Sequence, residues 1–322
     1  MALNYFLRGG YKKCIRNLRK SRDCDKIFVV RIFKLGVKFL KQIIINADDF
    51  GRHELINRAV KIACEKGCLK SATIMAGGIA FDDAIKTARN LPNLGLGIHL
   101  TLANGNPILP PEKIPSLVTE DKIFHDNHAA FLKLYLQGKI NLDEVRAELA
   151  AQIEKVKRTG LNLTHVDSHQ HLHHVPKIID IVLELADAAG IHAMRISDTK
   201  IFEGHFGGVG QFIGRVGLAS LAKFAARKAH AKNFLSPNHF TGIVAGESVT
   251  ENFMINLLEN LREGTTEVML HPGIDNEVLK NFCKWEHDFQ AELDAVTSPK
   301  VLKLLEEKNI STVNFSALRY DE

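Results

Sequence analysis

Residues 42–51 read QIIINADDFG, and this stretch joins a buried strand to the polar residues that end it. The isoleucines at 43–45 are typical of a strand that is buried on both faces, as in a parallel sheet. Asp48 and Asp49 follow almost at once. Adjacent carboxylates repel each other, and a divalent cation would relieve that repulsion. Asp also favours turns and helix caps, so a simple cap of the following helix is the alternative.

Outward from this strand, short apolar runs alternate with helical patterns to the end of the chain, which is typical of βα units. We expect strands at residues 43–46, 72–75, 95–100, 163–167, 193–196, 241–244, 267–270 and 311–315. We expect helices at residues 54–66, 80–90, 142–159, 177–189, 251–262 and 298–308. Eight strands with crossover helices predict an α/β fold, a closed or distorted (β/α) barrel over residues 42–322. A doubly wound open sheet is the alternative.

Two stretches interrupt the alternation. Residues 104–140 contain four prolines and predict a long loop with a short helix. Residues 204–232 open with four glycines and continue as a basic helix. The glycines predict a flexible connection or a lid, because they lack the strand–GxGxxG–helix context of a phosphate-binding loop.

Unusual polar residues stand at or near the ends of four other predicted strands, namely His99, Asp167 with His169, Arg195 and His271. The C-terminal ends of parallel barrel strands converge on one face, and that face holds the active site. Five of the fifteen histidines lie within residues 165–174, where alternate positions of an extended chain would share a face. The pattern predicts that at least one of these histidines binds a metal or takes part in catalysis.

Composition limits the other classes of function. Five cysteines in 322 residues do not suggest a disulfide framework and indicate a reducing compartment. Residues 1–41 carry twelve Lys/Arg and two Asp, a net charge of +10, which leaves the rest of the chain at −5. A mildly acidic body does not predict a nucleic-acid binder. We therefore expect a cytoplasmic protein.

The first 41 residues form a basic extension ahead of the predicted barrel. Basic residues interrupt its apolar runs, so we expect neither a secretory signal nor a membrane span. Arg31, Lys34, Lys38 and Lys41 fall on one helical face, and apolar residues cover most of the rest. Such an amphipathic helix suits peripheral contact with an anionic membrane surface at the inner membrane, and packing against the barrel is the alternative.

Four ordered motifs resemble the YdjC-like carbohydrate deacetylases, the family that includes chitooligosaccharide deacetylase and the hopanoid-associated deacetylase. The motifs are NADDFG at 46–51, GIHL at 97–100, HVDSHQHLH at 165–173 and HPG at 271–273. The resemblance begins near residue 42 and runs to the end of the chain. The loop at 107–115 and residues 238–270 look closer to the hopanoid-associated branch, which would imply a role in hopanoid biosynthesis.

The resemblance implies a distorted barrel of the polysaccharide-deacetylase type, with one divalent metal bound by Asp49, His99 and His169. It also implies Asp48 as general base and His271 as general acid. One carboxylate with two imidazoles suits Zn²⁺, Mn²⁺, Co²⁺ or Fe²⁺, whereas Mg²⁺ would need water to complete its shell.

Substrate binding is assigned to Arg195, His171 and His173. For Arg195 two other roles stay open, since it could restrain the neighbouring Asp48 or form a salt bridge within the barrel wall.

The implied activity is removal of an N-acetyl group from an amino sugar in a small oligosaccharide or a glycolipid. The rival interpretations are a metal-dependent phosphoesterase, a glycoside hydrolase and a non-catalytic sugar- or metal-binding barrel. A glycosidase needs two carboxylates about 5 to 10 Å apart across the sugar, whereas this Asp pair is adjacent and lies beside histidines. The exact sugar, the native metal and the oligomeric state do not follow from the sequence.

Overall fold

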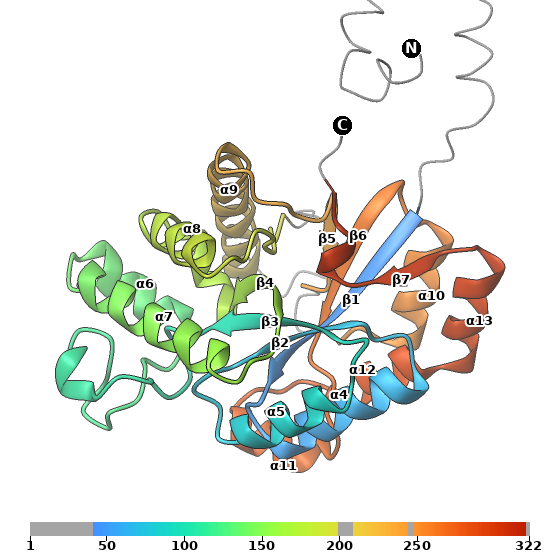
Figure 1. The fold of residues 1–322 in the computed structure, drawn as a ribbon, viewed down its shortest axis with the longest axis horizontal. Helices are drawn as coiled ribbons and strands as arrows, with labels where there is room; N and C mark the ends of the chain where they lie inside the picture. Colours follow the sequence, from blue (N-terminus) through green and yellow to red (C-terminus); the bar gives the residue numbers. More distant parts are fainter. Residues whose placement is uncertain (1–40, 199–208, 244–247, 320–322) are drawn as a thin grey trace, which may run out of the picture. The chain divides into compact units, whose positions relative to one another are not determined.

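We describe residues 41–198, 209–243 and 248–319 of a computed structural model of the chain (Figure 1). One parallel sheet carries the fold, with strand order β4-β3-β2-β1-β6-β5 and with β7 paired to the first residues of β1. The strands are β1 (Lys41–Phe50), β2 (Ser71–Ile74), β3 (Gly95–Leu100), β4 (Leu163–Ser168), β5 (His239–Thr241), β6 (Gly264–Leu270) and β7 (Ser311–Val313).

Two isolated bridges close this sheet into a distorted barrel. Val166 of β4 pairs with Met194, and Ala193 pairs in turn with Leu235, which lies shortly before β5. The fifth predicted strand is therefore present only as single bridges between β4 and the segment that leads into β5. The predicted (β/α) barrel is confirmed, and the open doubly wound sheet is not found.

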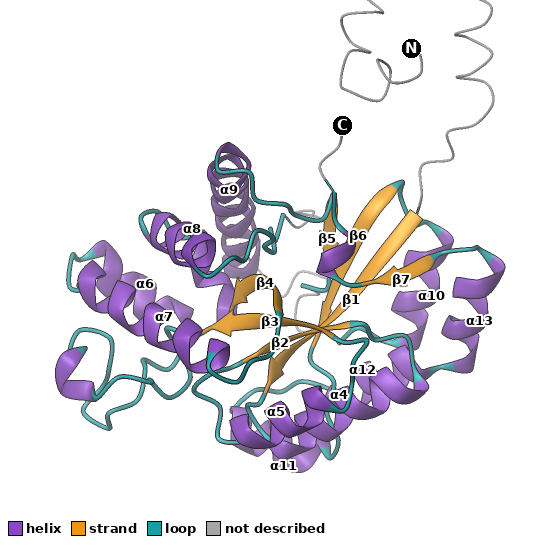
Figure 2. Cartoon of the chain, viewed as in Figure 1, coloured by secondary structure: helices purple, strands orange, loops and turns teal. Residues whose placement is uncertain are grey.

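Helices cover the outside of the strands (Figure 2). Those of the described residues are α4 (Glu54–Lys66), α5 (Phe81–Arg89), α6 (His128–Leu136), α7 (Leu142–Lys157), α8 (Ile178–Ala188), α9 (Val209–Ala231), α10 (Glu251–Glu259), α11 (Asn276–Cys283), α12 (Phe289–Thr297) and α13 (Pro299–Glu307), with 3-10 turns η1 (Pro111–Lys113), η2 (His169–His174) and η3 (Phe315–Ala317). Local sequence determines where several of these helices begin. The side chain of Asn141, for example, accepts the N–H of Asp143 and caps α7.

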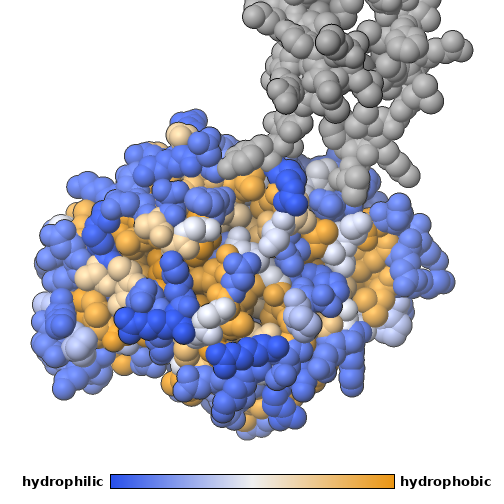
Figure 3. Space-filling model, viewed as in Figure 1, coloured by the Kyte–Doolittle hydropathy of each residue, from blue (hydrophilic) through white to orange (hydrophobic). Residues whose placement is uncertain are grey.

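The interior along β1 is apolar, whereas the visible surface is mixed. Ile43, Ile44 and Ile45 are fully buried, as the parallel-sheet interpretation predicted. Figure 3 shows apolar areas interspersed with hydrophilic side chains on the visible face. No helix among the described residues combines the length and the apolar character that a membrane crossing requires.

Several observed elements differ from the predicted ones. β1 runs to Phe50 rather than ending at residue 46, because β6 pairs with its first part and β2 with its last part. β5 begins at His239, two residues before the predicted strand. The helices α11 and α12 were not predicted.

Residues 1–40 of the leading amphipathic extension lie outside the described residues, whereas Lys41 of its basic stripe begins β1. Residues 199–208, with three of the four glycines of the expected lid, also lie outside them. Peripheral membrane contact and the lid therefore stay predictions. The basic helix expected after the glycines corresponds to α9.

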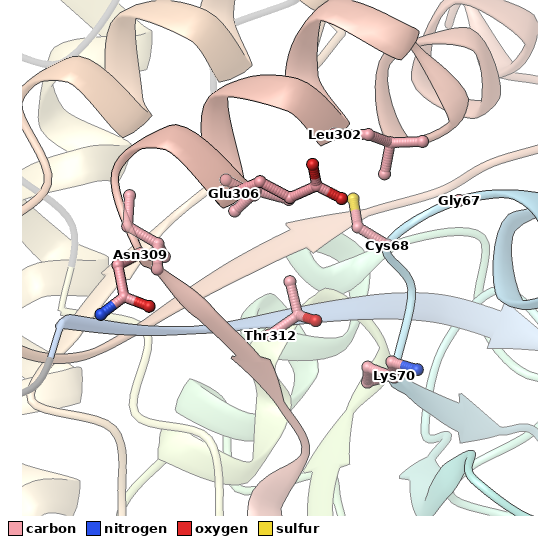
Figure 4. Close-up of a pocket in the computed structure, with 9 residues that line it drawn as sticks. Gly67, Cys68, Lys70, Leu302, Glu306, Asn309 and Thr312 are labelled. Carbon is pink, nitrogen blue, oxygen red and sulfur yellow. The ribbon is translucent and has the colours of Figure 1, made fainter.

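The N-terminal ends of the strands carry a hollow of about 360 Å³ (Figure 4). Lys70 of its lining directly precedes β2, and Thr312 pairs with Ile43 near the start of β1. The hollow therefore lies at the opposite end of β1 from Asp48 and Asp49. It contains none of the predicted site residues, which agrees with the rule that barrel chemistry occurs at the C-terminal strand ends.

Candidate metal centre and active site

The two adjacent aspartates lie at the C-terminal end of β1 and point in different directions. The Asn46 side-chain amide donates to Asp48 Oδ1 over 2.9 Å, and Ser71 Oγ donates to Asn46 Oδ1 over 2.7 Å. Asp49 has a φ of 60°, a left-handed conformation that is costly for a residue other than Gly, Asn or Asp. The strand therefore turns between the two carboxylates, so that each faces its own set of partners.

Asp49, His99 and His169 bring three ligand atoms together. Asp49 Oδ1 lies 2.9 Å from His169 Nδ1 and 3.4 Å from His99 Nε2. All three residues are buried, and their ligand atoms lie within 4.8 Å of one another. Asp49 Oδ1 and His99 Nε2 have no hydrogen-bond partner in the described part of the chain. Buried polar atoms without partners are costly, and a divalent cation would satisfy both, so these residues fit a metal.

A carboxylate behind His99 fixes the orientation of its ring. His99 Nδ1 donates to Asp167 Oδ1 over 2.7 Å, and the two residues face each other in the β3–β4 register. With the proton on Nδ1, the lone pair of Nε2 points toward Asp49. This is the carboxylate–histidine arrangement that orients imidazole ligands in metal sites.

Charge around His99 is strongly negative. Burial of the ring opposes protonation, but Asp167 and Asp48 outweigh it and raise the pKa of His99 to about 10. A cation at Nε2 would compete with this second proton and balance the same carboxylates.

Arg195 is fully buried and contacts three carboxylates. Its guanidinium binds both oxygens of Asp48 at 2.6 Å, Asp167 Oδ2 at 2.6 Å and Glu267 Oε1 at 2.7 Å. The prediction that Arg195 binds substrate is therefore not supported, because its side chain lies within the barrel. Of the alternatives, restraint of Asp48 agrees with the geometry.

Asp48 lies beside the candidate ligand group of Asp49, His99 and His169 without sharing its closest contacts. Its Oδ2 is 3.9 Å from His99 Nε2. Burial opposes its ionisation, but Arg195 and then His99 outweigh that effect and hold the pKa of Asp48 well below its usual range. Asp48, His99 and Asp167 also group closely, yet Arg195 and His99 Nδ1 already occupy both of these carboxylates. Asp49 is therefore the better metal ligand of the pair.

His271 follows β6 and reaches the same end of the barrel. Its backbone N–H donates to the carboxylate of Glu292, which also accepts the N–H of Val249 over 2.8 Å. Burial lowers the pKa of the His271 imidazole, while Asp48 and Asp49 act in the opposite direction. His287 lies 3.3 Å from Glu292, and its ring centroid is 5.6 Å from that of His271. Glu292 thus anchors the main chain of His271 beside the aspartate pair.

The histidine-rich segment does not present one common face, which corrects the prediction from alternation. β4 ends at Ser168, and Gln170 and His171 then adopt left-handed φ values of 53° and 57° within η2. His165 stacks on Phe315 at 3.6 Å between ring centroids, in the barrel wall. Of the odd-numbered histidines from 165 to 173, only His169 lies in the candidate ligand group with Asp49 and His99.

The two histidines assigned to substrate binding have different surroundings. Both ring nitrogens of His173 are engaged, Nδ1 with Ser168 Oγ at 2.6 Å and Nε2 with the Arg195 carbonyl at 3.1 Å. Since His173 is also buried, it supports the Arg195 strand and does not offer a group to substrate. His171 is partly exposed, and its Nδ1 lies 3.0 Å from Ser197 Oγ.

Sequence reasoning missed several residues that support the site. Glu267 is a fully buried acid within β6, and burial raises its pKa to about 7 although Arg195 opposes the shift. A single charged residue within an apolar strand was the available signal. Arg52 donates to Asp49 Oδ2 over 2.7 Å, and its place three residues after a carboxylate gave only a weak indication.

The fold and this cluster define the class of the protein: a distorted α/β barrel with a carboxylate–histidine metal-type site at the C-terminal strand ends. Residues 42–307 match the family described as YdjC-like protein, and the chain belongs to that family. The resemblance drawn from the four motifs is thereby confirmed.

Curated relatives cover nearly the whole barrel. The chain is 28% identical over 282 residues to a carbohydrate deacetylase of Thermoanaerobacter pseudethanolicus (strain ATCC 33223 / 39E), covering 87% of this chain and 100% of that protein. It is 29% identical over 280 residues to a chitooligosaccharide deacetylase of Enterobacter sp. (strain 638), covering 85% and 98%. A crystal structure from Enterococcus faecalis V583, provisionally described as a cellobiose-phosphate cleavage protein, superposes with a TM-score of 0.68 at 26% identity, covering 86% and 98%.

Proposed function

We propose that this chain is a metal-dependent hydrolase that removes an N-acetyl group from an N-acetylated amino sugar. The observation that carries the proposal is the convergence of buried, unpartnered ligand atoms of Asp49 and His99 beside His169, with an ionised Asp48 adjacent to them. The names of the curated relatives support acetylated carbohydrates as the substrate class.

Each residue would have a separate role. When bound at Asp49, His99 and His169, a divalent cation would polarise the acetamide carbonyl and increase the acidity of the attacking water. Asp48 would accept a proton from that water. Since burial favours its neutral form, His271 would first take up a proton and then donate it to the departing amine nitrogen.

The support around these groups explains how they would keep their roles. Arg195 stabilises the ionised form of Asp48, and its bidentate contact fixes the carboxylate in one orientation. Asp167 keeps a proton on His99 Nδ1, so that Nε2 remains available to a cation. The donor set suits Zn²⁺, Mn²⁺, Co²⁺ or Fe²⁺, and Mg²⁺ with additional water ligands.

The glycoside hydrolase alternative is less favourable, because it needs a carboxyl group that stays protonated to act as general acid. Partner charges hold the pKa values of both Asp48 and Asp49 well below normal. Glu267, whose pKa is raised, is fully buried against Arg195.

A small amphiphilic glycolipid, such as a hopanoid glycoside, is the second substrate candidate, and the predicted amphipathic helix in residues 1–41 is the feature that favours it.

Acetate release tests the proposal. Metal-free protein is supplied with Zn²⁺, Mn²⁺, Co²⁺, Fe²⁺ or Mg²⁺ and with N-acetylated mono- and disaccharides, and products are analysed by mass. We expect loss of one acetyl group only when metal is present. The exposed variant Asp187→Asn serves as control and should match the wild type, whereas His99→Gln should lose activity. Release of sugar or phosphate without acetate would instead support a glycosidase or a phosphoesterase.

A further inference from the structure

A pocket of about 300 Å³ opens directly beside the candidate ligand group of Asp49, His99 and His169, and the proposed chemistry does not use it. Arg52 connects the two, since it lines the pocket and donates to Asp49 Oδ2 over 2.7 Å. Met75, which follows the C-terminal end of β2, also belongs to the lining. The pocket therefore lies on the same face of the barrel as the candidate ligands.

One wall of the pocket is polar and held in position. The Arg52 guanidinium donates to Asn104 Oδ1, and the Asn104 amide donates to the carbonyl of Asp126 over 2.9 Å. Arg52 is mostly buried, so its head group is fixed by these contacts and not by solvent. Fixed polar groups of this kind give a pocket its orientation and specificity.

The rim of the same pocket is apolar and exposed. Ile79, Ile123 and Phe282 are three of the large hydrophobic side chains that are exposed in the described part of the chain, and all three line this pocket. His53 packs edge-on against the Phe282 ring at 4.8 Å between centroids and so fixes its plane. Exposed apolar groups gathered around fixed polar ones indicate a binding site for a molecule with both kinds of surface.

A sugar ring has such surfaces: its C–H groups form an apolar face, and its hydroxyl groups lie around the edge. The volume is at the lower end of the range for ligand pockets, about 300 to 1,000 Å³, which suits one ring better than a longer chain. We propose that this pocket binds the sugar unit next to the acetylated one, with Phe282 stacked against its apolar face. This inference rests on the proposed function and specifies its substrate as a disaccharide or longer.

Kinetics with two substrates test the inference. Acetate release from N-acetylglucosamine and from N,N′-diacetylchitobiose is measured with metal-loaded Phe282→Ala and Ile79→Ala. We expect Phe282→Ala to raise KM for the disaccharide about tenfold, within the range of one aromatic contact, with kcat changed less than twofold. KM for the monosaccharide should not change. Val278→Ala is the matched control, because Val278 is also on α11 and is 42% exposed, against 40% for Phe282, but lies outside the pocket.

Direct binding separates this inference from the proposed function. If no sugar releases acetate, the deacetylase proposal fails, and calorimetric binding of the disaccharide still tests the pocket. Weaker binding by Phe282→Ala and Ile79→Ala than by Val278→Ala supports the subsite. Equal disaccharide affinity in all three variants, or equal disaccharide KM where turnover occurs, overturns it. Thermal melting of each variant identifies any loss of fold, and the second rim residue keeps the test valid if one variant is unstable.

Discussion

Replacement of Asp167 by Asn tests the most consequential contact of the candidate metal centre. The substitution keeps the size of the side chain but removes the charge that lies 2.7 Å from His99 Nδ1. Loss of a carboxylate behind a ligating histidine typically lowers metal affinity by about 10- to 100-fold, or about 1.4 to 2.7 kcal/mol. Asp167 is not itself a proposed ligand, so a merely structural carboxylate would leave the affinity unchanged.

The same change also affects Arg195, and the size of that effect can be bounded. Arg195 loses the negative charge at the 2.6 Å contact with residue 167 but keeps the carboxylates of Asp48 and Glu267. We expect a loss of stability of about 1 to 3 kcal/mol, because a buried hydrogen bond to a charged group is weakened but the arginine does not become unpaired. The fold should therefore persist at room temperature.

Titration calorimetry of metal-free protein with Zn²⁺ or Mn²⁺ provides the assay, with denaturant unfolding on the same samples. Thr73→Val is the matched control, since Thr73 Oγ1 lies 3.2 Å from both His99 Nδ1 and Asp167 Oδ2 but carries no charge. We expect the control to change the affinity less than threefold. Wild-type metal affinity in Asp167→Asn, with His99→Gln unable to bind, would refute the orienting role.

Three further predictions concern other parts of the molecule. Asp48→Asn should keep the metal and reduce kcat by about 10²- to 10⁴-fold, the usual contribution of a general base. Metal content and acetate release are measured on one sample. Loss of the metal would mean that the roles of the two aspartates are reversed. Burial lowers the pKa of His174 to about 3, so this residue folds as the neutral form. The contribution of His174 to stability is complete above its unfolded pKa of 6.5 and decreases at lower pH, by about 1.4 kcal/mol at pH 5.5. In His174→Gln the fall in unfolding free energy between pH 7.5 and 5.5 should be smaller by that amount. An equal fall in both proteins would contradict this. Deletion of residues 1–40, which leaves β1 intact, should abolish sedimentation with anionic vesicles, because each basic residue contributes on the order of 1 kcal/mol near such a surface. Equal sedimentation of both chains would favour a helix packed on the barrel.

The sequence predicted the fold through the alternation of strands and helices, and it predicted where the chemistry lies. Strand-end placement predicted that the aspartate pair, His99 and the histidine-rich segment would share one face, because parallel strands in a barrel direct their C-terminal ends to one side. The set Asp49, His99 and His169 came from the resemblance to the YdjC-like family. The length of β1 and the reduction of the fifth strand to single bridges could not be predicted, because pairing with neighbouring strands, and not local composition, decides how far a strand extends.

The roles of the supporting residues were decided only by tertiary contacts. Arg195 could as well have contacted substrate, until three carboxylates from different strands were found around it within the barrel. The left-handed turn after Ser168 removes His171 and His173 from the face that alternation assigned to them. Position along a strand depends on local sequence, whereas the partner of a buried charge depends on segments far apart in the chain. The place of the candidate site along the chain was therefore predicted by the sequence alone, and the charge network around it was decided only by the folded structure.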